Sequence, residues 1–311
     1  METGPAPQGE DNDSNPAHAI FEELGKAFQT GNVSEAEAAT RAIWQHLAEN
    51  QPAEPSPWLE AMGEAHRSEA IFDWPAAEQA YTRAVNAAAE QPGLQSSAYR
   101  ELSQFHQLFS RQALAASTAH LATEAARRQN VNSMVAIALR NEASLQLKSK
   151  NYPAAWNLIT EAFSVLEEGP MHNLPRAFAL LVRADYLIER ARLSEAEADL
   201  ANAWDFLKPW SEAHFAGGWQ SCFALWWSAK ARLQSQRGDA SGAEAAWREA
   251  VTRRRIIAEL PQLEGPYKHN FLAIVLGDLG RALEATSDPL AGETFAESRS
   301  IRAAIGLPPL S

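Results

Sequence analysis

A spaced pattern of small and large residues recurs along this chain and restricts its fold more than any other feature. In the copy that begins at Tyr152, a small residue follows at +3, a large one at +7 and a small one at +10. Spacings of 3, 4 and 3 place all four residues on one face of an α-helix. The small residues let a neighbouring helix approach closely, and the large ones fill the remaining space. The pattern therefore predicts repeated packing of helix on helix.

Copies of this pattern start at residues 33, 74, 113, 152, 193, 240 and 289, so the period is 39 to 49 residues. A period of this length is typical of solenoids, in which each repeat buries its apolar face against its neighbours. A second helical pattern and a tight turn precede each copy. The sequence predicts seven helix pairs: 17–30 with 33–49, 57–71 with 75–90, 94–110 with 112–128, 131–149 with 153–167, 174–190 with 194–207, 212–236 with 241–258, and 267–286 with 289–304.

Local chemistry at the start of the second helices supports these boundaries. Three copies carry a serine followed three residues later by glutamate, which predicts a capping box. These pairs are Ser34/Glu37, Ser194/Glu197 and Ser241/Glu244. Residues typical of turns precede the copies: Gly31-Asn32, Phe72-Asp73, Asn151, Gly238-Asp239 and Ser287-Asp288.

Composition excludes several classes of protein. Hydrophobic residues make up 46% and charged residues 21% of the 311, as in a globular chain. A net charge of −12 argues against nucleic acid or an anionic membrane as the partner. The single cysteine, Cys222, excludes a disulfide framework and a multi-cysteine zinc site. No long apolar run predicts a secretory signal or insertion into a membrane, so a cytoplasmic location is expected.

The chain divides into three parts by composition. Residues 1–15 are polar and hold no usable hydrophobic set, which predicts a disordered N-terminal tail. Residues 16–306 carry the repeats, and residues 307–311 are expected to form a C-terminal tail. The length alone suggests two domains, whereas the repeat predicts one continuous array.

The repeats resemble the tetratricopeptide repeat (TPR) family. The resemblance rests on Leu24-Gly25 and Leu279-Gly280 in first helices, on the Gly-Asn and Gly-Asp turns, and on the residues from Tyr152 to Ala162. Because the period exceeds 34 residues, the chain is most similar to the long-helix TPR proteins. The resemblance implies an all-α fold, a right-handed α-α superhelix of about seven antiparallel helix pairs. It also implies a concave face lined by the first helix of each pair.

The resemblance places polar and charged residues of the first helices on that concave face. Arg140, Ser144 and Lys148 lie one turn apart and form a basic stripe in an acidic protein. Asp185 and Glu189 form an acidic stripe on the next first helix. The full set of expected partner-binding residues is Arg100, Gln104, Arg140, Ser144, Lys148, Asp185, Glu189, Arg232 and Arg281. Charge-assisted hydrogen bonds from Arg140 and Lys148 would hold a carboxylate, although solvated surface charge explains them equally well.

Three other features have two interpretations each. Trp219, Trp226 and Trp227 are either core residues or an interface with a partner or a second copy, since Trp is enriched at interfaces. The basic run Arg253-Arg254-Arg255 is expected to be solvated at a helix end, where cations complement the helix dipole, or to meet an acidic partner. Cys222 is expected to be a buried, inert thiol.

No motif for phosphate, dinucleotide, metal or nucleophilic chemistry is present in the sequence. We therefore predict a protein that is not an enzyme and uses no cofactor or metal. The favoured function is a scaffold or adaptor that binds a peptide or protein segment in the concave groove. Two alternatives stay open: a regulator that senses a peptide or small molecule, and a scaffold that forms homo-oligomers through its Trp-rich C-terminal half.

Overall fold

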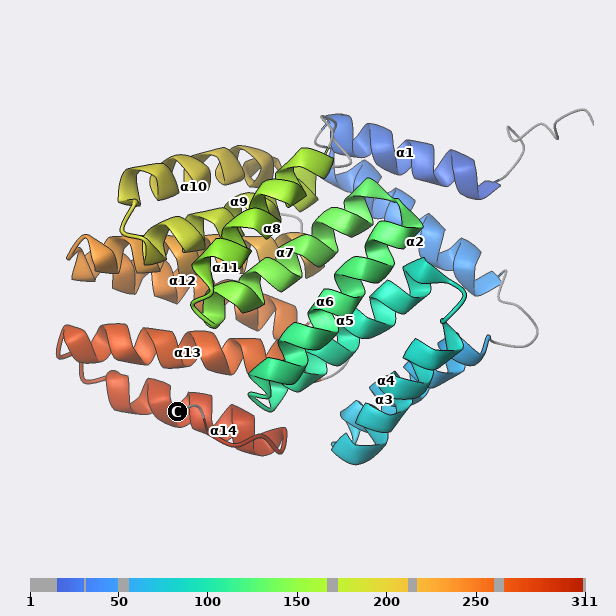
Figure 1. Ribbon diagram of the computed structural model, residues 1–311. Coiled ribbons are helices and arrows are strands. Elements are labelled where there is room, and N and C mark those ends of the chain that lie inside the picture. Colours follow the sequence, from blue (N-terminus) through green and yellow to red (C-terminus); the bar gives the residue numbers. More distant parts are fainter. Residues whose placement is uncertain are drawn as a thin grey trace, which may run out of the picture. The chain divides into compact units, whose positions relative to one another are not determined.

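The protein was analysed as a computed structural model, which describes residues 16–30, 32–49, 56–166, 173–211, 217–259 and 266–309. These residues form helices and turns and contain no strand (Figure 1). The predicted disordered tail, residues 1–15, lies outside them. The helices are α1 (Pro16–Thr30), α2 (Val33–Glu49), α3 (Pro57–Ala70), α4 (Trp74–Ala87), α5 (Pro92–Leu108), α6 (Gln112–Gln129), α7 (Asn132–Lys148), α8 (Tyr152–Val165), α9 (Asn173–Glu189), α10 (Leu193–Leu207), the short 3-10 helix η3 (Lys208–Trp210), α11 (Gly217–Gln236), α12 (Ala240–Glu259), α13 (Tyr267–Ala285) and α14 (Ala291–Ala304).

Contacts divide the chain into two compact units, Met1–Ala53 and Glu54–Ser311. In the first unit α1 packs on α2, and Ala27, Ala36 and Ala39 are buried. The second unit holds the twelve helices from α3 to α14. The expected boundaries of a single repeat domain, residues 16 and 306, stay a prediction.

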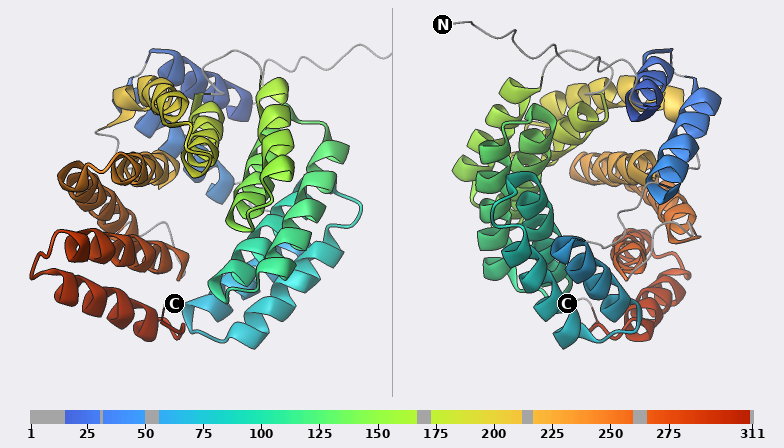
Figure 2. Two further views of the ribbon diagram at one scale, coloured as in Figure 1. Left: turned by 60° about the vertical axis from the view of Figure 1, so that its left-hand side comes forward. Right: turned by 90° about the vertical axis from the view of Figure 1, so that its right-hand side faces the viewer.

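Consecutive helices of the second unit pack in pairs. The most extensive contacts are α3 with α4, α5 with α6, α7 with α8, α9 with α10, α11 with α12 and α13 with α14. Each pair also contacts the next pair. The first helices of neighbouring pairs contact each other as well: α7 contacts α9, and α9 contacts α11. Figure 2 shows the two helices of these pairs lying side by side. The predicted all-α solenoid of helix pairs is therefore confirmed.

The small residues of the repeat lie where helices approach most closely. At +3 and +10, the alanines of the four best copies are all buried: Ala77, Ala84, Ala155, Ala162, Ala196, Ala203, Ala243 and Ala250. The large residues at +7 are buried as well: Tyr81, Ile159, Leu200 and Trp247. An alanine permits the close approach of two backbones, and the large residue fills the adjoining space.

The turns within the pairs of the second unit share one backbone geometry. One residue in each turn has a left-handed conformation with φ between 55° and 77°: Phe72, Ser110, Lys150, Ala191, Gly238 and Ser287. In each turn the next residue donates its N–H to a carbonyl five residues back, as Asp239 does to Gln234 at 3.0 Å. This bond closes the helix in a Schellman-like motif and reverses the chain within a few residues.

The predicted capping boxes are wrong. The helices α2, α10 and α12 begin at Val33, Leu193 and Ala240, so the serine of each box lies inside the first turn. No side chain caps α10, since Arg192 holds its N-cap position. Glu197 and Glu244 instead bind Arg237 and Arg248.

Asn and Asp residues of the turns provide the caps. The Oδ1 atom of Asn32 accepts from the Glu35 N–H at 3.2 Å, Asp73 from Ala76 at 3.2 Å, and Asp239 from Gly242 at 2.9 Å. Short acceptor side chains at this position satisfy the free N–H groups of the first turn. The turn residues recognised in the sequence therefore also start the second helices.

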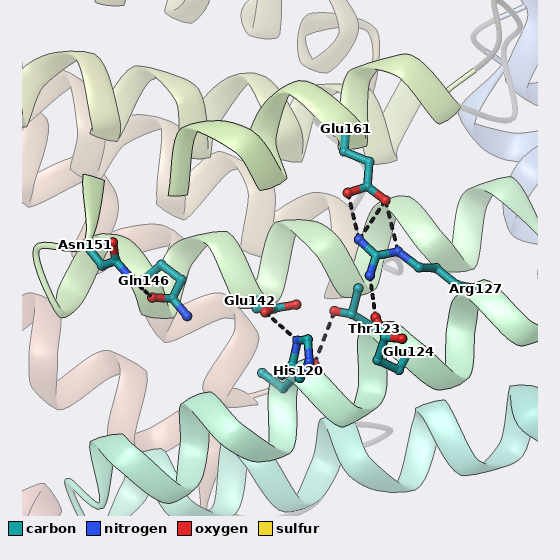
Figure 3. Close-up of polar contacts among 9 residues, drawn as sticks. His120, Thr123, Glu124, Arg127, Glu142, Gln146, Asn151 and Glu161 are labelled. Atoms are coloured by element: carbon teal, nitrogen blue, oxygen red, sulfur yellow. Dashed lines mark hydrogen bonds and ion pairs between the residues drawn. The ribbon is translucent and has the colours of Figure 1, made fainter. Parts of the chain in front are cut away.

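Arginine–glutamate pairs connect successive second helices at their exposed edge. Arg127 on α6 binds both carboxylate oxygens of Glu161 on α8 at 2.7 Å (Figure 3). Nearby, the imidazole of His120 lies 3.0 Å from the carboxylate of Glu142 on α7. Four pairs follow this pattern: Arg111–Glu78, Arg127–Glu161, Arg237–Glu197 and Arg255–Glu297. Exposed ion pairs contribute little net stability, but their bidentate geometry favours one register between neighbouring pairs.

Candidate functional site

The expected binding residues lie on five first helices of the second unit. Arg100 and Gln104 lie on α5, Arg140, Ser144 and Lys148 on α7, Asp185 and Glu189 on α9, Arg232 on α11 and Arg281 on α13. Because α5 contacts α7, α7 contacts α9 and α9 contacts α11, the first seven of these residues and Arg232 belong to one continuous layer of helices.

Arg140 is a half-buried cation of this layer. Its guanidinium lies 4.4 Å from the ring centroid of Phe178 on α9 and donates to the Asn141 Oδ1 atom at 2.6 Å. Burial lowers the pKa of Arg140 to about 10, and the positive charge of Arg100 acts in the same direction. Among the described residues no carboxylate forms an ion pair with Arg140, so the charge is held by a ring and an amide.

Lys148 lies two turns further along α7. Its ammonium group donates to the Gln107 Oε1 atom on α5 at 3.0 Å. Its side chain is exposed to solvent, yet the surrounding protein lowers its pKa by burial, opposed by Asp185. A side chain that is both accessible and surrounded by protein is expected on the wall of a concave surface. Its expected role in a groove stays a prediction.

Arg232 and Asp185 join α11 to α9 through a short ion pair. Burial acts to lower the pKa of Arg232, but the charge of Asp185 and its hydrogen bond more than offset this, and the pKa is raised. Burial raises the pKa of Asp278 on α13, against the effect of Arg281 and Arg232. Arg281 itself binds Asp278 on its own helix. These pairs neutralise one another, whereas Arg140 and Lys148 have no ion-pair partner among the described residues.

The other expected residues are placed less centrally. Arg100 binds Glu101 at 3.1 Å, and Gln104 and Ser144 are half-buried. Glu189 is exposed and accepts a long hydrogen bond of 3.5 Å from the Tyr152 hydroxyl. Sequence reasoning missed Gln107, Asn141 and Phe178, which hold the two cations. Gln107 lies one turn beyond Gln104, which is the one sequence signal that would have found it.

The tryptophans expected at an interface pack mainly within the chain. Trp219 is buried and stacks on Trp210 with centroids 5.0 Å apart. Trp226 is also buried, and its indole N–H donates to the Leu200 carbonyl at 2.7 Å. Trp227 is half-buried and crosses Trp226 edge to face at 4.8 Å. The core interpretation therefore holds for Trp219 and Trp226, and an interface role for Trp227 stays a prediction.

The basic run on α12 differs from the expected solvated helix end. Arg255 is exposed and binds Glu297, but Arg253 is part-buried and donates to the Ser211 carbonyl at 3.0 Å. Arg254 is 5% exposed, lies 4.9 Å from the ring centroid of Phe271, and its Nε–H has no hydrogen-bond partner among the described residues. The prediction is therefore wrong for Arg254, because the residue falls on the apolar face of α12 that packs on α13.

Cys222 is fully buried on α11, as predicted. Burial raises the pKa of its thiol well above the ordinary value, so the thiol is protonated and a poor nucleophile at neutral pH.

A cavity that the sequence did not indicate lies between α8 and α9. It has a volume of about 500 Å³ and is lined by Tyr152, Pro153, Trp156, Asn157, Tyr186 and Arg190. Trp156 and Tyr186 pack with centroids 5.0 Å apart, and the Arg190 guanidinium lies 5.0 Å from the Tyr152 ring. Its aromatic rings come from the consecutive helices α8 and α9.

The described residues contain no group of three or more His, Cys, Asp or Glu side chains that could hold a metal ion. None of the helices in this part of the chain combines the length and apolar character needed to cross a bilayer.

Comparison with known proteins defines the fold class. No protein-family model matches the sequence, and neither does any curated protein. Among solved structures, the apo form of RapI is similar with a TM-score of 0.56 and 12% identity, covering 94% of this chain and 99% of that one. A Rap protein complexed with Competence and Sporulation Factor is similar with a TM-score of 0.56 and 14% identity, covering 94% of this chain and 78% of that one.

A third similar structure is aspartyl phosphate phosphatase F from Bacillus subtilis, with a TM-score of 0.50, 11% identity and coverage of 99% of both chains. These similarities and the paired helices show that the chain has a TPR-like helical-repeat fold. At such low identity they describe the fold alone.

Proposed function

We propose that this protein is a non-catalytic scaffold that binds a peptide or protein segment along α5, α7 and α9. The observation that carries the proposal is Arg140, a half-buried guanidinium with a lowered pKa and no ion-pair partner in the described residues. An enclosed charge without a counter-charge is costly in the free protein. A ligand carboxylate would remove that cost and would form charge-assisted hydrogen bonds.

The spacing of Arg140 and Lys148 indicates how acidic groups would be spaced in the ligand. Arg140 and Lys148 are eight residues apart on one helix, which is about 12 Å at 1.5 Å per residue. An extended chain advances about 3.3 Å per residue. A peptide segment lying along α7 would therefore bring one acidic group to each cation if the two acidic groups were three to four residues apart. The neutral side chains of Gln104 and Ser144, half-buried on α5 and α7, would hydrogen-bond to its backbone.

One of the similar structures supports binding of a peptide-like partner. That structure is of a Rap protein complexed with Competence and Sporulation Factor. The bound factor belongs to that protein, to which the present chain is 14% identical in sequence. The similarity supports a groove of suitable architecture, while the choice of ligand rests on Arg140 and Lys148.

The test is selection from a displayed library of random peptides, followed by calorimetric titration of the selected peptides. Arg140→Gln and Lys148→Gln should each weaken binding by about 10- to 100-fold, since a hydrogen bond to a charged group contributes about 1.5–3 kcal/mol. The matched control is Arg83→Gln, which removes an arginine that pairs with Glu64 on the exposed edge of α4. Selected peptides without acidic residues, or equal affinity for Arg140→Gln and the wild type, would contradict the proposal.

The alternative functions stay predictions with distinct tests. A sensor would change its small-angle scattering profile when ligand binds. A self-assembling scaffold would show a mass above 34.1 kDa in light scattering, and Trp227→Ala would lower it.

A further inference from the structure

The C-terminal segment of the second unit packs against the first helix pairs of that unit. Ile305 and Leu307 are 5% and 4% exposed and share an apolar cluster with Leu108 at the end of α5. The half-buried rings of Trp74, Phe109 and Tyr267 cover this cluster. The residues meet across about 200 positions of sequence, so this contact is not part of the stacking of consecutive pairs.

Gly306 makes the approach possible. It has a φ of +67°, which residues with a side chain rarely adopt. A Cβ atom at this position would lie 3.3 Å from the indole nitrogen of Trp74, a tight contact. Behind it, the guanidinium of Arg302 is 3% exposed and donates to the Pro308 carbonyl and to the Asn270 Oδ1 atom on α13. The segment is therefore fixed to α13 and α14 and presented to α4.

A polar contact crosses the same junction. The Tyr267 hydroxyl at the start of α13 donates to the Glu69 Oε1 atom near the end of α3 at 2.7 Å. Glu69 is 2% exposed. The groups that face it are Tyr267 from α13, Tyr81 from α4 and the carboxylate of Glu101 from α5. None of these brings a positive charge to Glu69.

We propose that Ile305, Gly306, Leu307 and Tyr267 form a latch that joins the two ends of the second unit, and that the latch opens when the Glu69 carboxyl group loses its proton. The neutral acid suits the junction because Glu69 is buried beside the Tyr81 and Tyr267 hydroxyls and no positive charge faces it. The ionised form would place a carboxylate that no cation faces in a buried site.

The direction of the pH effect follows from Glu69. Burial raises the pKa of Glu69 from 4.5 to about 7, the hydrogen bonds of Tyr267 and Tyr81 act against this, and Glu101 adds to it. In the open form the carboxyl group meets water, and its pKa returns to the ordinary value. The closed form therefore binds an additional proton between these two values, and closure is favoured at low pH and lost as pH rises through 7. Between pH 5 and pH 8 the ratio of closed to open molecules should fall on the order of 50-fold.

Opening of the latch would affect the proposed groove. The latch joins α5, through Leu108, to α13, through Tyr267. Both helices carry expected binding residues, Arg100 and Gln104 on α5 and Arg281 on α13. The latch itself requires no ligand, so its test does not depend on the groove assignment.

The test measures the distance between the two ends of the unit by fluorescence energy transfer. Dyes are attached to Ile71→Cys, in the exposed turn after α3, and Arg299→Cys, on the exposed face of α14. Cys222 is fully buried and is expected to stay unlabelled. We expect high transfer at pH 5.5 and a decrease at pH 8.5. In the same background, Glu69→Gln keeps the neutral form and should retain high transfer at both values of pH.

Two variants make the outcome decisive. Glu64→Gln changes an exposed glutamate on the same helix and should keep the response of the parent. Leu307→Ser loosens the apolar cluster and should give low transfer at both values of pH, which also decides the matter if Glu69→Gln does not fold. Transfer that is independent of pH in the parent, a full response in Glu69→Gln, or high transfer in Leu307→Ser would each overturn the proposal.

Discussion

Adjacent residues of the same type in this protein can differ widely in burial. Arg253, Arg254 and Arg255 are adjacent, yet one is part-buried, one is buried and one is exposed. Burial lowers the pKa of Arg254 to about 10 with no compensating charge. The helical period explains the division, because consecutive residues point about 100° apart. The sequence shows three consecutive basic residues. How deeply each side chain is buried depends on where α13 packs against α12.

Replacing the buried Arg254 by methionine should stabilise the protein. Methionine fills a similar volume and removes the cost of enclosing an unpaired charge, so Arg254→Met should raise the free energy of unfolding by about 1–3 kcal/mol. Urea denaturation followed by circular dichroism measures it. The neighbouring exposed variant Arg255→Met should change the value by at most about 1 kcal/mol. Destabilisation by Arg254→Met would show that the guanidinium has a partner that stabilises it.

At the scale of the helix, the repeat specifies which face packs, while the turns specify where each helix begins. The alanines at +3 and +10 are buried in every well-formed copy. The start of each second helix depends on the left-handed residue of the turn and on an Asn or Asp cap where one is present. Serine and glutamate in the first turn matched a capping pattern, but each helix starts two residues before the position that this pattern needs.

A buried repeat alanine should not tolerate a larger side chain. Ala196 on α10 is fully buried, whereas Ala198 on the same helix is exposed. Ala196→Leu should lower the free energy of unfolding by about 1–3 kcal/mol through overpacking. Ala198→Leu should change it by at most about 0.5 kcal/mol. Thermal and urea denaturation of both variants measure the difference, and equal effects would contradict the assignment of the packing face.

At the scale of the whole second unit, nearest-neighbour packing is supplemented by one contact between distant pairs. Repeat arrays are stabilised mainly by contacts between adjacent repeats. Here Tyr267 and Glu69 are joined across 198 residues, and Leu307 is buried although the sequence assigned it to a tail. The expected tail at residues 307–311 therefore begins with a packed residue.

Removal of residues 305–311 should lower stability in a pH-dependent way. The deletion exposes apolar surface of the cluster around Leu108, at a cost of about 2–4 kcal/mol at pH 5.5. The cost should be smaller at pH 8.5, because ionisation of Glu69 already disfavours the junction in the full-length chain. Chemical denaturation of both proteins at the two values of pH measures the costs. A cost that is larger at pH 8.5 would contradict the assigned direction.

The sequence by itself determined the helix pairs, the packing faces and the positions of the turns, because each depends on residues within about fifty positions of one another. The tertiary structure decided which charges on those helices are neutralised. Arg232 meets Asp185, whereas Arg140 meets only Phe178 and Asn141. It also decided that Glu69 meets Tyr267. Such pairings depend on the rotation between stacked pairs, which accumulates along the array, and no local pattern in the sequence encodes that sum.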